Sequence, residues 1–454
     1  MASVQPSLTR LRQDAAKIFQ SGIDAVNAEA AVSNACQIKG DQLHIQDTPF
    51  DLSAYANIYV IGAGKASADM AVALEPLLGD RITGGAITVK YAHTRPLKHI
   101  DLIEAGHPIP DDNGLKGAQR ILAIADQANE ADLVICLPPG RGSALLPQPA
   151  ASLAFSDKQA VIQALLDCGA TINEINALRK HISAIKGGRL AGKVWPASLI
   201  TLILSDVVGD KLDVIASGPT VPDPSTFADC LRIIESYHLK NRIPESVLKH
   251  LEMGASGGIE ETPKADAEVF HQTYNYIVGS NITALKAARK TAESLGYKTL
   301  ILSSMIQGET REAARIHAAI AREIRQTGNP LAPPACLLSG GETTVTIKGD
   351  GLGGRNQEFA LAAAIDIRDE DMMAILSGGT DGTDGPTDAA GAIVDGTSFQ
   401  KAEKKGLYPD TYLNNNDSYH FFSQTEELLM TGPTGTNVMD LRIVLVEELD
   451  TKKG

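Results

Sequence analysis

The chain has 454 residues, of which 43% are hydrophobic and 21% are charged, and its formal net charge is −14. A chain of this length can bury the cores of two or three domains, and its composition is that of a globular protein. The negative charge argues against nucleic acid and anionic membranes as partners, because the net field repels both.

Cysteine usage and hydropathy point to the cytoplasm. The five cysteines are scattered without a C-x-x-C pair, which predicts buried thiols in a reducing compartment. The sequence has no apolar run of membrane-spanning length and no hydrophobic region of a signal peptide at its start. We therefore expect a cytoplasmic protein.

The first chemical signal follows a pair of helices expected over residues 7–37, with a break near Ser21. Residues 57–61 predict a short strand that runs into the glycine turn 62–67 and a helix to about residue 78. A strand, a glycine turn and a helix form a nucleotide-type unit. Inside the turn, Lys65 is well placed to meet a carboxylate or a phosphate.

Strands are expected at residues 86–90 and 100–104, a helix up to about residue 127, and a buried strand at 132–137. The loop 138–146 leaves that strand at its carboxyl end, where open α/β sheets bind ligands. Ser156 is expected to cap the next helix.

Residues 173–191 predict one further helix, which carries Arg179, Lys186 and Arg189 as a basic cluster in an acidic protein. The following G-x-x-x-x-G-K match is not a P-loop, because Val194 replaces the Ser or Thr that binds magnesium and no strand precedes it. A strand at 198–204 then ends before Asp206. An acid in that position can be a metal ligand or a general base.

Residues 253–268 lack periodicity and predict a domain boundary, which we set between 1–258 and 259–454. Helices and strands alternate in both halves, so the fold class is α/β throughout.

The second chemical signal lies in residues 335–395. Two apolar runs each end in Ser-Gly-Gly with an acid close by, Glu342 and Asp381. Between them lie the glycine turn 349–354 and Arg355, which opens a helix. Backbone N–H groups, an arginine and carboxylates suit an anion held with a metal ion, and a phosphorylated ligand best. Spacing alone does not choose between a kinase and a dehydrogenase.

Eleven ordered motifs between about residues 10 and 446 resemble the glycerate 2-kinase family, also known as the MOFRL family, for which the name hydroxypyruvate reductase was formerly used. The motifs are GAGKAS (62–67), AGHPIPDDNG (105–114), GSALL (142–146), LRKHISAIKGGRLA (178–191), LSDVVGD (204–210), ASGPTVPDPSTF (216–227), VGSN (278–281), LSGGETTV (338–345), GRNQEFALAAA (354–364), SGGTDGTDGPTDAAGAIVD (377–395) and TGPTGTNVMDL (431–441).

This resemblance implies transfer of the γ-phosphoryl group of ATP to the 2-hydroxyl of D-glycerate, with Mg²⁺ as the metal. It implies two domains, an N-terminal Rossmann-like α/β/α sandwich and a smaller C-terminal mixed α/β domain, with the active site in the cleft between them. The expected partners are therefore D-glycerate and ATP, with no nucleic acid and no membrane, and a homodimer is compatible with the sequence.

Carried over to matching positions, Lys65 and Arg355 are the family's catalytic cations. Asp206 is a third catalytic candidate, as metal ligand or base, and Ser143 is a loop contact. The residues selected for binding substrate or nucleotide are Gly62, Gly64, Ser67, Gly142, Ser143, Arg189, Gly340, Gly341, Glu342, Asn356 and Asp381, and those selected for the metal are Asp206 and Asp384.

One departure from the family concerns the loop before Ser143, where Pro139 and Arg141 replace residues of a Ser-Gly-Gly-Gly run. Pro139 removes an N–H group and Arg141 adds bulk and charge where backbone would approach a phosphate. Arg141 either supplements the phosphate cradle or weakens it. Two alternative functions follow: an NAD(P)H-dependent hydroxypyruvate reductase that uses one glycine turn for the dinucleotide, and a non-catalytic sugar-acid sensor.

Overall fold

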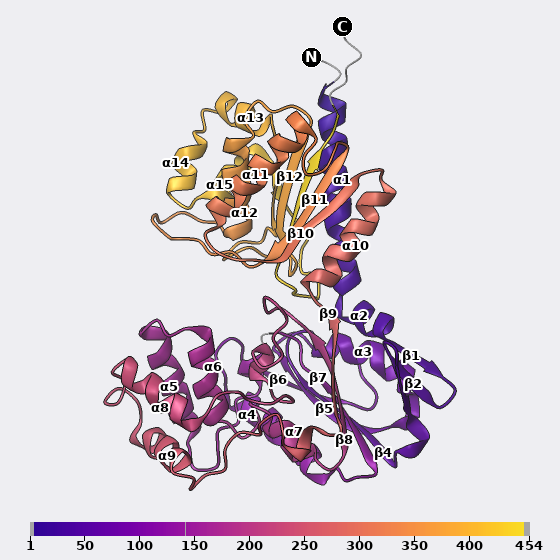
Figure 1. Cartoon of the computed structure of the whole chain (residues 1–454), viewed down its shortest axis with the longest axis vertical. Helices are drawn as coiled ribbons and strands as arrows, with labels where there is room; N and C mark the ends of the chain where they lie inside the picture. The colour runs from indigo at the N-terminus through magenta and orange to yellow at the C-terminus, as the bar shows by residue number, and fades with distance from the viewer. Residues whose placement is uncertain (1–3, 141, 449–454) are drawn as a thin grey trace. The chain divides into compact units, whose positions relative to one another are not determined.

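The computed structural model describes residues 4–140 and 142–448, which form two compact units (Figure 1). One unit is Ala28–Val278, and the other combines the chain up to Asn27 with the chain from Gly279 onward. Helix α1 (Val4–Val26) therefore packs with the C-terminal half. The boundary expected after residue 258 lies after Val278, and the chain up to Asn27 groups with the C-terminal half instead of the N-terminal domain expected from the sequence.

The sheet of the unit Ala28–Val278 has the strand order β6-β5-β4-β7-β8-β9. The strands are β4 (Asn57–Ala63), β5 (Ile82–Lys90), β6 (Asp101–Ala105), β7 (Asp132–Leu137), β8 (Ser198–Leu204) and β9 (Thr273–Gly279). The pairs from β6 to β8 are parallel. Strands β5 and β6 follow β4 and extend the sheet on one side of it. The chain then returns, and β7 pairs with the other side of β4. The order of strands thus reverses between β4 and β7, which is the topological switch point of a doubly wound sheet.

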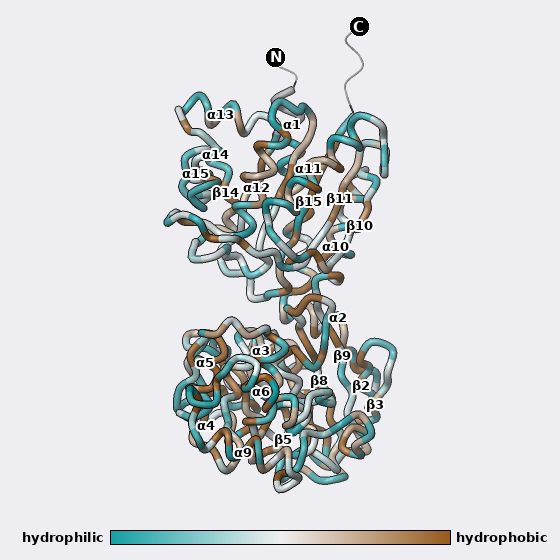
Figure 2. The backbone as a smooth tube through the Cα atoms, turned by 60° about the vertical axis from the view of Figure 1, so that its left-hand side comes forward, coloured by the Kyte–Doolittle hydropathy of each residue, from teal (hydrophilic) through white to brown (hydrophobic). Residues whose placement is uncertain are grey.

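Helices cover both faces of this sheet, so its central strands read as continuous apolar runs. One core cluster joins the sheet to α2 (Ala28–Ala35), to α3 (Ser67–Leu78) and to a small antiparallel sheet. That small sheet consists of β1 (Cys36–Lys39), β2 (Gln42–Ile45) and β3 (Thr48–Asp51). On the other face lie α4 (Asp112–Gln127) and α7 (Arg189–Val194). The hydrophobic segments therefore concentrate inside each unit (Figure 2).

A group of four helices has a hydrophobic core of its own within the same unit. Its members are α5 (Phe155–Asp167), α6 (Ile172–His181), α8 (Phe227–Ser236) and α9 (Glu245–Ala255). This helical group carries two of the basic residues considered below, Lys158 and Arg179.

The second unit contains a mixed sheet with the order β10-β11-β15-β12-β13-β14. Its strands are β10 (Lys298–Ile306), β11 (Ala335–Gly341), β12 (Met373–Gly379), β13 (Gly391–Asp395), β14 (Leu428–Leu429) and β15 (Asp440–Val446). Only β10 and β11 form a parallel pair among these neighbours. Helices α1 and α10 (Asn281–Ser294) cover one face, and α11 (Thr310–Thr327) and α12 (Arg355–Asp366) cover the other.

The remaining helices of this unit are α13 (Ser398–Lys404), α14 (Pro409–Asn414) and α15 (Ser418–Thr425). They pack on the α12 side of the sheet. Successive residues of β11 alternate between the two clusters, with Leu337 on the α12 face and Leu338 on the α1 face. The period of two that strands impose thus gives this sheet two buried faces.

Three sequence expectations about helices were wrong. The helix expected over 173–191 is two helices, because Gly187 and Gly188 adopt φ of 60° and 78° between α6 and α7. Helix α1 continues through Ser21 and ends at Val26. The N-cap of α5 is Ala154, not Ser156.

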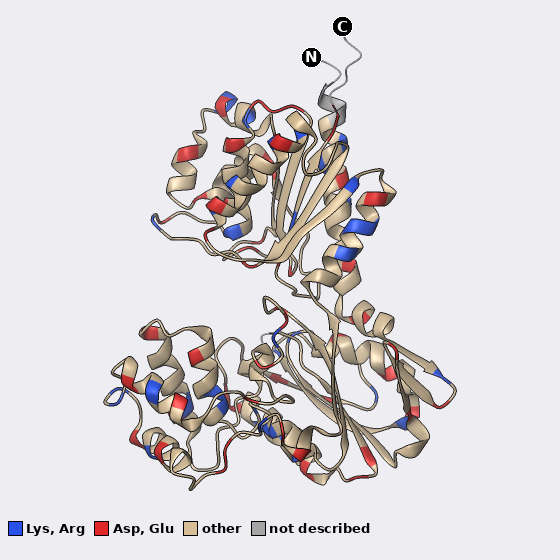
Figure 3. Ribbon diagram, in the orientation of Figure 1, with Lys and Arg blue, Asp and Glu red and all other residues tan. Residues whose placement is uncertain are grey.

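Lys and Arg are interspersed with Asp and Glu on the helices of both units (Figure 3). Among the described residues, no helix combines the length and the apolar character that a membrane span requires.

Candidate active site

The switch point between β4 and β7 brings two glycine loops into contact. Gly64 has a φ of 156°, and a Cβ at this position would overlap the ring of Pro139. A Cβ on Gly142 would overlap the carbonyl oxygen of Ala63. The Ser67 hydroxyl donates to the Leu137 carbonyl at 2.8 Å and ties the loops together. The two loops approach each other so closely at the carboxyl end of the sheet that only glycine fits at positions 64 and 142.

Lys65 and Asp206 lie on loops at the same edge of this sheet. Lys65 is half-buried between the end of β4 and the start of α3, and Asp206 is half-buried just after β8. A Cβ on Gly140 would overlap the Asp206 carboxylate, so that side chain packs against the loop that follows β7. Since β7 separates β4 from β8, the strands that carry the two residues are about 10 Å apart.

Ser143 is held by a buried lysine that the sequence analysis did not select for the site. Lys186 donates to both the carbonyl and the hydroxyl oxygen of Ser143 at 2.8 Å. The Ser143 hydroxyl also lies 3.2 Å from the hydroxyl of Ser217, which in turn donates to Asn176. The loop position of Ser143 is therefore fixed from two sides. Arg141 lies outside the described residues.

Arg189 lies in different surroundings from Lys186. Its guanidinium donates to the carbonyl oxygen of Glu260 at 3.2 Å, and it lines a cavity of about 620 Å³ together with Glu261. Burial lowers the pKa of Arg189, and the nearby acids oppose that effect. The basic cluster expected from the sequence is thus divided, with Arg189 among acids.

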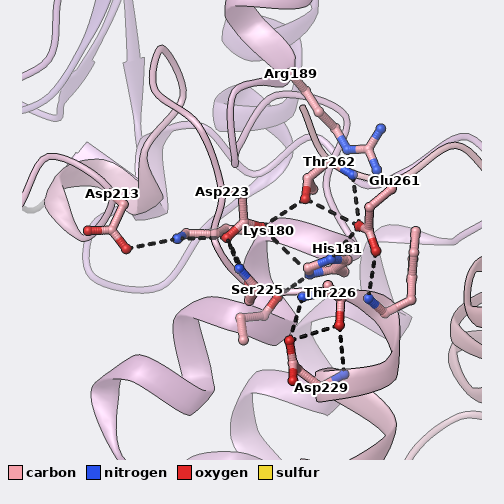
Figure 4. Close-up of polar contacts among 12 residues, drawn as sticks. Lys180, His181, Arg189, Asp213, Asp223, Ser225, Thr226, Asp229, Glu261 and Thr262 are labelled. Atoms are coloured by element: carbon pink, nitrogen blue, oxygen red, sulfur yellow. Dashed lines mark hydrogen bonds and ion pairs between the residues drawn. The ribbon is translucent and has the colours of Figure 1, made fainter. Parts of the chain in front are cut away.

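Asp223 organises the polar network beside Arg189 (Figure 4). Its carboxylate accepts from Lys180 at 3.1 Å, from the backbone and hydroxyl of Ser225, and from the Thr262 hydroxyl. Burial opposes ionisation, but Lys180 and Ser225 outweigh it and lower the pKa of Asp223. These hydrogen bonds hold together the loops that follow β8, and they give the ammonium group of Lys180 a carboxylate partner.

In the second unit, Arg355 opens α12 and binds the first residue of β15. Its Nε and Nη2 donate to the two carboxylate oxygens of Asp440 at 2.8 and 2.9 Å. Its Nη1 lies 3.0 Å from the Glu342 carboxylate. Burial disfavours the charge, but Asp440 outweighs burial and raises the pKa of Arg355. The predicted catalytic arginine is therefore already paired with two acids.

Asp440 and Arg442 were not selected from the sequence, although they form the centre of this cluster. Arg442 is fully buried, donates to Asp440 and Thr343 at 3.0 Å each, and stacks over the ring of Phe359 at 5.1 Å. A bidentate pair and a stacked guanidinium are the arrangements that arginine favours in buried places.

Asp384 caps the N-terminus of α12. It accepts from the backbone N–H groups of Asn356 and Gln357 at 3.0 and 2.8 Å, and from the Asn356 side chain. Burial raises its pKa to about 7, with Asp440 adding to the rise and the N–H donors opposing it. Asn356 also donates to Asp440 at 2.9 Å, so it joins the two acids. Such a carboxylate serves the helix end.

The donor sets give different answers for the two expected magnesium ligands. Asp384 does not fit, because it is 2% exposed and the N–H groups at the start of α12 take up its oxygens. Asp206 fits better, because it is half-buried at the mouth of the sheet. No group of three or more His, Cys, Asp or Glu in the described ranges could hold a metal ion. Magnesium bound with phosphates needs only one or two carboxylates.

The other candidates of the second unit take part in turns and close packing. Asp381 accepts from the backbone and hydroxyl of Thr383 at 3.2 Å, which forms an Asx turn. Gly340 packs against the side chain of Asn281, and Gly341, with a φ of 123°, packs against the backbone of Ile306.

The glycine turn 349–354 is also internally satisfied. The N–H groups of Lys348 and Gly349 donate to the Asn416 side chain at 2.7 and 3.0 Å. Those of Gly351 and Leu352 donate to residues 415 and 417. Since these donors are used inside the protein, the turn offers little backbone to a phosphate or a dinucleotide.

The doubly wound unit and the mixed unit define a two-domain α/β protein with separate charged clusters at sheet edges. A family model described as a domain of unknown function (DUF4147) matches residues 14–252, and the MOFRL family model matches residues 335–440. The glycerate 2-kinase of Pyrococcus horikoshii is 43% identical over 437 residues, which cover 96% of this chain and 97% of that protein. The D-glycerate 2-kinase of Thermotoga maritima is 43% identical over 392 residues, which cover 86% of this chain and 90% of that protein.

A crystal structure of a Thermotoga maritima glycerate kinase matches with a TM-score of 0.87 and 40% identity, covering 96% of this chain and 100% of that one. The chain belongs to the glycerate kinase family with a MOFRL domain. The expected family and the α/β fold class are thereby confirmed.

Proposed function

We propose that the protein is a glycerate 2-kinase that converts D-glycerate and ATP into 2-phospho-D-glycerate and ADP. In this reaction the 2-hydroxyl oxygen forms a bond to the γ-phosphorus, and the bond between that phosphorus and the bridging oxygen of the β-phosphate breaks. The proposal is carried by near full-length similarity to two proteins named as glycerate 2-kinases. It is supported by Lys65 and Asp206 at the switch-point edge of the doubly wound sheet.

Lys65 is proposed to compensate the negative charge of the transferred phosphoryl group. Phosphoryl transfer asks the protein mainly for cations and for alignment of the acceptor. A lysine on the switch-point turn, beside bare glycine backbone, meets that need. Replacing Lys65 with alanine is expected to lower kcat/KM by about 100-fold or more.

Asp206 is proposed either to accept the proton of the 2-hydroxyl or to hold magnesium, whose charge would neutralise the phosphates of bound ATP. An Asp206→Asn variant separates these roles. If Asp206 is the base, kcat falls by about 10²–10⁴-fold while the magnesium dependence is unchanged. If Asp206 is a metal ligand, the magnesium concentration required for half-maximal activity rises.

Arg355 is proposed as a second cation of the reaction, a role that the family resemblance implies. Its pairing with Asp440 and Glu342 fixes the guanidinium in direction. We propose that it acts through directed hydrogen bonds more than through net charge, so Arg355→Lys, which loses the planar fork, should not restore activity.

The test is an assay of the purified protein with D-glycerate, ATP and Mg²⁺, with the product identified by phosphorus NMR. A 2-phosphoglycerate signal that is lost in Lys65→Ala supports the proposal. Oxidation of NADH or NADPH by hydroxypyruvate, without phosphoryl transfer, would support the reductase instead. Absence of both reactions, with glycerate still bound, would favour the sensor.

A further inference from the structure

A cavity of about 350 Å³ opens between the helical group and the loops that follow β6 and β7. Its wall is largely apolar, with Ile109, Phe155 and Ile162 among the lining residues. Its polar lining includes Ser143 and three cationic side chains, Lys158, Arg179 and Lys186. No acidic residue contributes to this lining within the described chain. The cavity is therefore an apolar pocket with a strongly basic part.

The three cations have only neutral hydrogen-bond partners. Lys158 donates to the Gln148 carbonyl at 3.1 Å, and Arg179 donates to the Asn176 side-chain oxygen at 3.4 Å. Lys186 donates to Ser143, as described above. In the described ranges, no carboxylate lies within 4.0 Å of any of these three groups. A lysine ammonium has three donors and a guanidinium has five, so bonding capacity remains for a ligand.

Lys180, the neighbour of Arg179 in the sequence, shows the usual solution for a buried cation. It is paired with Asp213 and Asp223 at 3.3 and 3.1 Å (Figure 4). Helix α6 thus carries one lysine that acids neutralise and one arginine that faces two further cations without an acid. The contrast indicates that the missing negative charge of the pocket comes from outside the chain.

The electrostatic cost of this arrangement is visible in the acid–base properties of the lysines. Lys158 is 6% exposed and Lys186 is 1% exposed. Burial, followed by the charge of Arg179, lowers the pKa of Lys158 to about 7. Burial, followed by Lys158 and Arg179, lowers the pKa of Lys186 well below its ordinary value. A bound anion would relieve the repulsion and favour the charged lysines.

We propose that this pocket, defined by Ser143, Lys158, Arg179 and Lys186, binds an oxyanion group of a ligand, a phosphate or a carboxylate. Three cations balance a multiply charged phosphate better than a single carboxylate, and the apolar wall suits the body of a larger ligand. The pocket adjoins the switch point through Ser143, whose neighbour Gly142 packs against Ala63. The assignment to nucleotide or glycerate rests on the proposed function, whereas the anion site itself does not.

The test is isothermal titration of wild type, Lys158→Met and Arg179→Met with three separate probes: inorganic phosphate, ADP and D-glycerate. Loss of phosphate and ADP affinity by about tenfold or more, with glycerate affinity unchanged, assigns the pocket to nucleotide phosphates. Loss of phosphate and glycerate affinity, with ADP affinity unchanged, assigns it to the carboxylate. Lys249→Met, at an exposed lysine paired with Glu245 on α9, is the matched control for lost surface charge.

Two features keep the outcome decisive. Each variant is checked by circular dichroism and by its melting temperature, and Arg179→Met serves if Lys158→Met does not fold. Phosphate is expected to raise the melting temperature of wild type and to leave that of a folded variant unchanged. The proposal is overturned if folded variants bind all three probes as wild type does. Phosphate binding without kinase activity would refute the proposed function while leaving the pocket intact.

Discussion

The Asp440→Ala variant offers the sharpest test of the charged cluster in the second unit. The Asp440 carboxylate is fully buried and accepts four hydrogen bonds, from Arg355 Nε and Nη2, Asn356 Nδ2 and Arg442 Nη2. Removing it leaves the Arg442 charge buried with Thr343 as its remaining bonded side chain among described residues. Breaking a buried ion pair by removing one partner costs about 3–5 kcal/mol.

That cost is large beside the total stability of a domain, which is typically about 5–15 kcal/mol. With a urea dependence of about 1–3 kcal/mol per molar, the unfolding midpoint of this unit should fall by about 1–5 M. Circular dichroism follows both units, whereas the single tryptophan, Trp195, reports on the unit Ala28–Val278. In Asp440→Ala, the unfolding transition followed by circular dichroism should therefore move to lower urea concentration. The onset of the transition followed by Trp195 fluorescence should stay at the same urea concentration as in wild type.

The matched control is Asp381→Ala in the same unit. Among the described residues, Asp381 accepts hydrogen bonds from the backbone and the hydroxyl of Thr383, both at 3.2 Å, so its loss should cost about 1 kcal/mol. If Asp440→Ala shifts the urea midpoint no more than Asp381→Ala does, removing Asp440 does not leave an uncompensated buried charge, and the reasoning fails.

Three further predictions concern the unit Ala28–Val278. Because the folded pKa of Lys158 is about 7 against an ordinary 10.5, the unfolded chain binds one more proton between these values. The free energy of unfolding of wild type, minus that of Lys158→Met, should therefore increase by about 1.4 kcal/mol per pH unit between pH 8 and 10. Urea titrations without phosphate measure this difference, and a difference that does not change with pH would contradict the lowered pKa. Gly142→Ala should lower the melting temperature, because its Cβ overlaps the Ala63 carbonyl, at a cost of about 1–3 kcal/mol; calorimetry with Gly84→Ala, where a Cβ has open space and φ is not left-handed, is the comparison. Lys65→Ala should lower kcat/KM for phosphoryl transfer by about 100-fold or more while leaving the melting temperature within a degree or two of wild type, and activity equal to that of Lys249→Ala would disprove the catalytic role.

The central strands of the doubly wound sheet were predictable because each is a short, largely apolar run. Residues 57–61, 132–137 and 198–204 lie within β4, β7 and β8, and the glycine turn after β4 leads into α3 as expected. Parallel strands covered on both faces require this pattern, so local sequence carries the information. The prediction of one helix over 173–191 was wrong because the apolar period continues across two glycines, whose left-handed conformation ends the helix.

Packing partners were less predictable than elements. Nothing in the local pattern of residues 4–26 indicates that α1 covers the sheet of the C-terminal half, because an amphipathic helix specifies that it has a buried face but not what covers it. The small antiparallel sheet at 36–51 was missed because its strands have four residues each, too few for a clear period.

Asp440 was missed because a rule for parallel strands was applied to a mixed sheet. The sequence predicts site acids that follow strands, since the carboxyl ends of parallel strands meet at one edge. In the second unit, β15 runs antiparallel to β11 and β12, and Asp440 pairs with Gly341 and Gly379 at their ends. The acid at that edge therefore begins a strand instead of following one. The partner of Arg355 could have been found only after the direction of β15 was known, whereas Lys65 and Asp206 follow parallel strands, so their place at one edge of the sheet could be predicted from the sequence.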